Sequence, residues 1–184
     1  MSNIVETWGS TAEERAASYP CERHIEAPTS TLYRAVDVDA PVHLTYQWLC
    51  QLRVAPYSYD WIDNFGRTSP RTRNSDNERL TIGERMMRIF TLVELEPDQH
   101  LTMVITRTKL FGAVAVTYSV KPRPGGSRIV AKIQMRLERR SLWSWFLPAG
   151  DLVMMRKQLL TLKRCAEKEA RALHTAQAEQ HVHA

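Results

Sequence analysis

The stretch that decides the fold runs from Tyr33 to Leu52 and reads YRAVDVDAPVHLTYQWLCQL. Residues 32–38 alternate and predict a β-strand, because successive side chains of a strand point to opposite faces. Residues 39–41 predict a helix start, since proline is tolerated in the first helical turn. The apolar face of this helix would consist of Thr45, Trp48, Leu49 and Leu52. A strand followed by a helix that ends before Pro56 is therefore expected.

Four further strands are predicted after a polar loop at residues 66–78. Their approximate limits are 84–96, 99–109, 113–121 and 127–138. The gaps between them carry turn residues, namely Pro97-Asp98, Phe111-Gly112 and the segment 122–126 with its Gly-Gly pair. Because the gaps are short, consecutive strands are expected to be antiparallel neighbours.

The alternation within these strands predicts one buried and one solvated face. On strand 84–96 the buried side would be Met87, Ile89, Thr91, Val93 and Leu95. On strand 127–138 it would be Ile129, Ala131, Ile133, Met135 and Leu137, opposite Arg128, Lys132, Gln134 and Arg136. Something must cover the buried face.

A long helix predicted at residues 149–173 is the natural cover. Its apolar stripe, with spacings of three and four residues, is Leu152, Met155, Leu159, Leu162, Ala166, Ala170 and Leu173. The other side of the helix is rich in lysine and arginine and is interpreted as a solvated face.

The order of these elements resembles the helix-grip fold of the SRPBCC superfamily, which includes START and birch-pollen-allergen proteins and polyketide cyclase/dehydrase-like proteins. The segments that carry the resemblance are YRAVDVDAPVHLTYQWLCQL (33–52), LTIGERM (80–86), VELEPDQHLTM (93–103) and VKPRPGGSRIVAKI (120–133). The resemblance implies an α+β fold, with a curved antiparallel sheet wrapped around a long C-terminal helix. It implies a cavity, and it does not imply a reaction.

The domain is expected to cover residues 30–174. Residues 1–29 would form an N-terminal extension, and residues 175–184 a flexible tail. With 184 residues, 43% of them hydrophobic, the chain is long enough for one domain with a substantial core.

The composition narrows the classes of partner. A net charge of +5 allows weak attraction to an anionic membrane surface, but the interspersed acidic residues do not form a nucleic-acid footprint. No segment predicts a membrane span or a secretory signal.

The three cysteines, Cys21, Cys50 and Cys165, lie far apart and indicate reduced thiols in a cytoplasmic protein. No histidine or cysteine spacing predicts a metal site, and no motif predicts a cofactor.

A hydrophobic or amphipathic small molecule is the expected ligand, held between the sheet and the long helix. Methionines in such a wall would adapt to varied ligand shapes. The predicted wall consists of Met87, Ile89, Met103, Ile105, Val116, Ile133, Met135, Leu152, Met155 and Leu159.

Two polar residues fall on the predicted buried face. Arg107 would hold an anionic or carbonyl group of the ligand, with Tyr118 deeper in the cavity as a hydrogen-bond donor. Alternatively, Arg107 extends to solvent at the rim or pairs with Asp60 or Asp63.

The aromatic stretch APYSYDWIDNFGR, residues 55–67, is predicted to lie across the open end of the sheet. Its rings would line or plug the cavity entrance, because aromatic side chains bury a large area while a polar tip reaches a partner. They are Tyr57, Tyr59, Trp61 and Phe65. Core packing is the alternative, and Asp60 with Asp63 could form a proton-transfer pair or pair with arginines.

Three loops, 66–78, 110–112 and 139–148, are expected to share one end of the molecule. That end would collect Arg67, Arg71, Arg73, Phe111, Arg139, Arg140, Trp143, Trp145 and Phe146. Apolar loop tips beside basic residues can contact a membrane surface. Packing of Trp145 and Phe146 under the final helix is the alternative.

Three functions remain open from the sequence. The first is binding of a hydrophobic or amphipathic molecule or lipid. The second is an enzyme of polyketide cyclase or dehydratase type, with Arg107, Tyr118, Asp60 or Asp63 moving protons. The third is an interaction module with a filled cavity that acts through its Trp- and Arg-rich end.

Overall fold

The computed structural model describes residues 4–58, 68–105, 112–136 and 143–182, with side chains in the last range described for residues 152–180. Within these ranges, six strands form one antiparallel sheet in the order β1-β6-β5-β4-β3-β2. The strands are β1 (Ser30–Val38), β2 (Arg85–Met86), β3 (Phe90–Glu96), β4 (His100–Ile105), β5 (Ala113–Arg123) and β6 (Gly126–Arg136). The predicted strand meander is confirmed, and β1 joins it beside β6. Residues 84–96, predicted as one strand, instead form the two antiparallel strands β2 and β3 joined by a turn.

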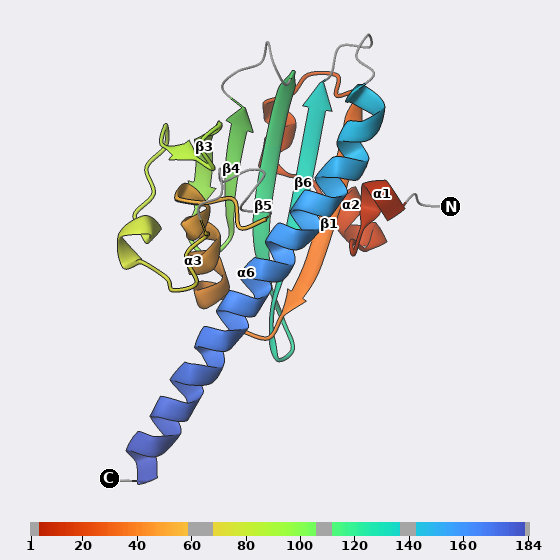
Figure 1. Ribbon diagram of the computed structural model, residues 1–184. Helices are drawn as coiled ribbons and strands as arrows, with labels where there is room; N and C mark the ends of the chain where they lie inside the picture. The colour runs from red at the N-terminus through yellow and green to blue at the C-terminus, as the bar shows by residue number, and fades with distance from the viewer. Residues whose placement is uncertain (1–3, 59–67, 106–111, 137–142, 183–184) are drawn as a thin grey trace.

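Helices cover one face of the sheet, which is called the inner face below. The helix α3 (Val42–Cys50) continues into the short η2 (Gln51–Arg53), and the long α6 (Trp143–Val182) crosses the sheet diagonally (Figure 1). The predicted α+β architecture with a long C-terminal helix is thus confirmed. The helix is longer than its apolar stripe. It continues beyond residue 173 through Ala- and Gln-rich sequence, and residues 171–180 are exposed.

The inner face holds the main core. Leu92, Leu101 and Met103 of the sheet are fully buried, as are Trp48 and Leu49 of α3 and Leu159 and Leu162 of α6. Because these side chains come from the sheet and from both helices, α6 is packed on the body of the molecule.

The outer face is not solvated as predicted. The segment before β1 packs on it through α2 (Ala12–Ala16) and η1 (Pro20–Arg23), whereas α1 (Ile4–Thr7) lies against β1 and α6. Tyr19, Cys21 and Ile25 bury Tyr33, Ala35, Ala115 and Val130 of the sheet in a second, smaller cluster. Lys132 and Gln134, predicted to face water, are therefore buried.

The predicted buried side of β3 is also wrong in its first half. Leu92 and Met86 are fully buried, whereas Ile89 is 38% exposed. Register shifts between Leu92 and Glu94, so Leu92 pairs with Met103 and Leu95 pairs with Leu101. A β-bulge of this kind reverses which residues face the core. The alternation in the sequence could not show where that reversal lies.

Within the described residues, no helix combines the length with the apolar character that a bilayer span requires.

Candidate functional site

A buried polar contact joins the sheet to α6 in the middle of the inner face. The hydroxyl of Tyr118, on β5, donates a hydrogen bond of 2.6 Å to Oε1 of Gln158, on α6. The side-chain amide of Gln158 donates one of 2.6 Å to the carbonyl oxygen of Pro56. Tyr118 and Gln158 are 1% and 3% exposed. A buried polar group costs free energy unless it is hydrogen-bonded, and these two groups satisfy each other.

Two methionine sulfurs border this polar contact. Sδ of Met155 lies 3.3 Å from the Tyr118 hydroxyl, and Sδ of Met87 lies 3.2 Å from the Gln158 amide. Both sulfurs are weak acceptors on flexible side chains, so the polar contact is surrounded by groups that can rearrange. We refer to Tyr118, Gln158, Met87, Met155 and Pro56 as the Tyr118 node.

Among the described residues, three of the five non-glycine positive φ angles lie at or beside the Tyr118 node. Tyr57, Met87 and Arg88 have φ angles of 55°, 45° and 67°. Bulky residues rarely adopt this left-handed region, and such strain persists where the surrounding structure imposes it. Met87 and Arg88 lie in the turn between β2 and β3, where paired positive φ angles usually call for asparagine or glycine. Tyr57 is 1% exposed and packs edge-on against Trp48, with ring centroids 6.2 Å apart.

Most described residues of the predicted wall are buried on the inner face. The buried ones are Met103, Ile105, Val116, Ile133, Met135 and Leu159, and the half-buried ones are Met87, Leu152 and Met155. Ile89 is exposed and does not face the core. Four predicted site residues, Tyr59, Trp61, Phe65 and Arg107, lie outside the described residues, as do Asp60 and Asp63. The ligand-binding role of the wall stays a prediction.

Sequence reasoning identified Tyr118 and missed Gln158. The available signal was that Gln158 is an uncharged polar residue adjoining the apolar stripe of α6, between Met155 and Leu159. The contact with Pro56 could not be found in this way, because a backbone carbonyl is present at every position.

A charged network fixes the distal half of α6 to α3 and to the segment before β2. The indole of Trp48 donates to Glu169 at 2.9 Å, and Arg73 donates to Glu169 at 2.8 Å. Arg73 also pairs with Glu78, in η3 (Ser75–Glu78). Arg73 therefore lies beside the distal half of α6. The loops with which it was predicted to share one end, near residues 110 and 140, lie outside the described residues.

Among the other members of the predicted Trp- and Arg-rich end, Arg71 is exposed and lies beside Cys165 of α6, whereas Arg67 lies outside the described residues. Phe111, Arg139 and Arg140 lie outside the described residues, and so do the side chains of Trp143, Trp145 and Phe146.

A groove of about 270 Å³ lies on the surface between α3 and the distal half of α6. Its lining includes Pro41, Leu44, Arg73, Ala170 and Leu173. None of the predicted wall residues borders it. Leu173 is 50% exposed, so the groove is an open surface feature, separate from the Tyr118 node.

Burial disfavours the thiolate form of all three cysteines. Burial raises the pKa of Cys50 to about 12, and burial also raises the pKa of Cys21 and of Cys165. A thiol that stays protonated at neutral pH is a poor nucleophile. All three are free thiols. Among the described residues, no three or more His, Cys, Asp or Glu side chains are grouped so that they could hold a metal ion.

Comparisons with known proteins show the fold. No family model matches the chain, and no curated protein matches it. The di-domain ARO/CYC protein StfQ, from the steffimycin biosynthetic pathway, is similar over 76% of this chain and 51% of its own length, with 14% identity and a TM-score of 0.51. This chain thus spans about half of StfQ. Ara h 8.0201 is similar over 77% of this chain and 97% of its own, with 9% identity and a TM-score of 0.48.

A third similar structure is the Aha1 dimer from Colwellia psychrerythraea, with 10% identity over 76% of this chain and 97% of its own, and a TM-score of 0.46. The likeness to StfQ agrees with the strand order and the long C-terminal helix described above. The helix-grip fold, which the sequence suggested, is confirmed. At these identities the likeness extends to the fold alone.

Proposed function

We propose that the protein binds a hydrophobic or amphipathic small molecule or lipid between the inner face of the sheet and α6. The observation that carries this proposal is the Tyr118 node, in which two neutral polar side chains, Tyr118 and Gln158, are buried among apolar ones. An amphipathic ligand needs an apolar wall and a few polar groups that fix its orientation.

The chemistry of the node suits exchange with a ligand. A ligand carbonyl or hydroxyl oxygen can replace Oε1 of Gln158 as the acceptor for the Tyr118 hydroxyl, without any change of charge. The methionines beside it can move to make room. The strained backbone at Tyr57 and Met87 supports the same interpretation, because strain of this kind clusters at ligand clamps. The competing interpretation is a core hydrogen bond that only fastens α6.

The other predicted wall residues follow from this proposal. Met103, Ile105, Val116, Ile133, Met135, Leu152 and Leu159 would contact the apolar part of the ligand, on both sides of the node. Tyr59, Trp61, Phe65 and Arg107 are retained as proposed entrance residues on the sequence argument alone. The cytoplasmic location also remains a proposal.

The test begins with native mass spectrometry of the freshly purified full chain, which reports any molecule that copurifies. Affinity is then measured by titration with the amphipathic fluorophore 1-anilinonaphthalene-8-sulfonate. Tyr118→Phe removes one hydroxyl and is expected to weaken binding about tenfold, the size of one lost buried hydrogen bond. Tyr33→Phe is a matched control, because the Tyr33 hydroxyl bonds the Arg15 carbonyl on the outer face. Equal affinities of the two variants would show that the node only fastens α6.

A second candidate is an enzyme of the polyketide cyclase or dehydratase type. The observation that favours it is the likeness to StfQ, an ARO/CYC protein, together with a buried tyrosine hydroxyl that could donate a proton. The partners of Tyr118 in the node are all neutral. A proton acceptor would therefore have to be one of the two predicted carboxylates, Asp60 or Asp63. Incubation of the copurified molecule with the protein, followed by mass spectrometry, tests this candidate. An unchanged mass and retention time would argue against it.

A further inference from the structure

The free edge of the sheet carries exposed aliphatic and basic side chains next to the Tyr118 node. The last strand in the sheet order is β2, which contains only Arg85 and Met86. A turn precedes it, closed by the Glu84 N–H bonding the Thr81 carbonyl at 3.1 Å. The strained turn with Met87 follows it. One short hairpin therefore forms this border of the molecule.

Three branched aliphatic side chains are exposed along this border. Ile82 is 63% exposed, Val54 is 43% exposed and Ile89 is 38% exposed. The hairpin is joined to the segment that contains Val54, because the Leu52 carbonyl, two residues before Val54, accepts a 2.9 Å hydrogen bond from the Met87 N–H. We define the basic edge as Val54, Ile82 and Ile89 together with the exposed arginines Arg79, Arg85 and Arg88.

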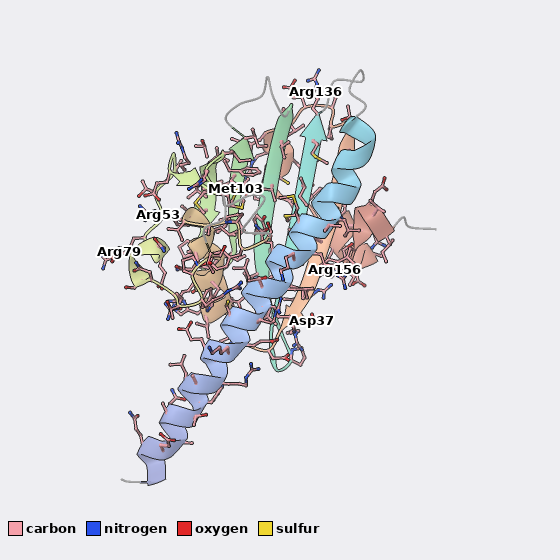
Figure 2. All side chains as sticks on the ribbon, in the orientation of Figure 1. Asp37, Arg53, Arg79, Met103, Arg136 and Arg156 are labelled. Atoms are coloured by element: carbon pink, nitrogen blue, oxygen red, sulfur yellow. The ribbon has the colours of Figure 1, made fainter. Side chains whose placement is uncertain are left out.

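Two carboxylates near the basic edge are paired with arginines outside it. Glu84 pairs with Arg53 at 3.3 Å, and Glu78 pairs with Arg73. Across the described ranges, neither Arg79 nor Arg85 forms an ion pair. Arg53 and Arg79 lie on one flank of the molecule, far from Asp37 and Arg156 on the other flank (Figure 2).

We infer that the basic edge docks on an anionic lipid bilayer. Arginines attract anionic headgroups, and adjacent aliphatic side chains gain free energy by entering the headgroup boundary. A second copy of the chain is a poor occupant, because the edge strand is short and its arginines would face arginines. The edge also continues into the proposed binding site, since Met87 lies in this hairpin and contacts Gln158. A lipid-like ligand would then have a short path between bilayer and node.

The experiment is flotation of the full chain with two kinds of vesicle, one of phosphatidylcholine alone and one of phosphatidylcholine mixed with phosphatidylserine. The wild type is expected to float with the anionic vesicles only, and less as salt is raised. The triple variant Arg79→Gln, Arg85→Gln, Arg88→Gln is expected to partition about 100-fold more weakly, from about 1 kcal/mol per basic residue near the surface. The double variant Ile82→Ser, Ile89→Ser is expected to bind more weakly than the wild type at every salt concentration.

The matched control carries the same charge change elsewhere. Arg164→Gln, Lys168→Gln, Arg171→Gln removes three exposed charges from the far half of α6 and should float like the wild type. Three results would overturn the inference, namely a wild type that ignores anionic vesicles, an edge triple variant that still floats, and a control that loses as much binding as the edge variant. Vesicle binding needs no ligand in the node, so its failure leaves the proposed function standing, and loss of ligand binding in Tyr118→Phe leaves docking standing.

Discussion

The two faces of the sheet are covered in different ways. On the outer face, ion pairs fasten the N-terminal segment. Arg128 of β6 donates to Glu14 of α2 at 2.5 Å and to Asp37 of β1 at 2.8 Å, and Lys132 pairs with Glu22. At the Tyr118 node on the inner face, neutral hydrogen bonds and apolar packing connect α6 to the sheet beside strained backbone. Farther along α6 the contacts are charged, since Lys163 donates to the Asp37 carbonyl at 2.7 Å and Glu167 accepts from the Asp39 N–H at 3.0 Å. The outer covering depends on charged partners that lose much when separated, whereas the Tyr118 node consists of neutral groups that can exchange partners.

The largest expected effect is at Arg128. Its guanidinium is held by the Glu14 carboxylate, and Glu14 is 8% exposed. Arg128→Met leaves that carboxylate buried without its partner and is expected to lower the free energy of unfolding by about 3 kcal/mol. Urea denaturation measures this. Arg164→Met, on an exposed face of α6, is the control and should change stability by less than about 0.5 kcal/mol. Similar small losses in both variants would contradict the contrast between the faces.

Acid should loosen the same ion pair with a smaller effect, because a protonated carboxyl can still accept a hydrogen bond. Burial alone would raise the pKa of Glu14, but hydrogen bonds from Arg128 and the Thr11 backbone outweigh it and hold the pKa below its ordinary value of 4.5. Hydrogen bonds from Arg128 and Arg23, respectively, also lower the pKa of Asp37 and of Glu94.

A carboxyl whose pKa is lowered by folding stabilises the protein above its unfolded pKa, and this stability is lost as pH falls. The wild type should therefore lose stability between about pH 6 and about pH 3.5, and Glu14→Gln should lose less over that range because it cannot bind the proton. Urea denaturation at both ends of the range gives the two differences. The same acid loss in Glu14→Gln would remove Glu14 from the explanation.

The same contrast explains which parts of the molecule could be predicted from sequence. The strands, α3 and α6 follow from periodicity, because one side of each meets the core. The predicted solvated face was wrong because Arg128 and Lys132 look like surface residues until Glu14 and Glu22 are brought to them by a segment distant in sequence. Ile89 was misplaced because periodicity carries no sign of the bulge in β3.

The candidate site was predictable to a smaller extent. Tyr118 could be identified as a polar residue on an apolar face, since its neighbours at two-residue spacing are valines. Its partner depends on how α6 is rotated and on how far it slides along the sheet, and both are set by packing in three dimensions. The strain at Met87 was equally hidden, because nothing in the sequence Met86-Met87-Arg88 resembles the asparagine or glycine that a tight turn prefers.

The smallest expected effect tests the backbone strain in the turn between β2 and β3. Here the substitution should raise the free energy of unfolding, not lower it. Arg88 has a φ of 67°, a conformation that costs a residue with a side chain about 1–2 kcal/mol. Arg88→Gly removes this cost but loosens the unfolded chain, so it should raise the free energy of unfolding by about 0.5–1 kcal/mol. Arg85→Gly, three residues earlier in the extended β2, offers no strain to relieve and should lower it by a similar amount. Urea denaturation of both variants measures these differences. If both variants lose stability, the turn is not strained. The proposal of a preformed ligand clamp beside Gln158 would then rest on the hydrogen bonds alone.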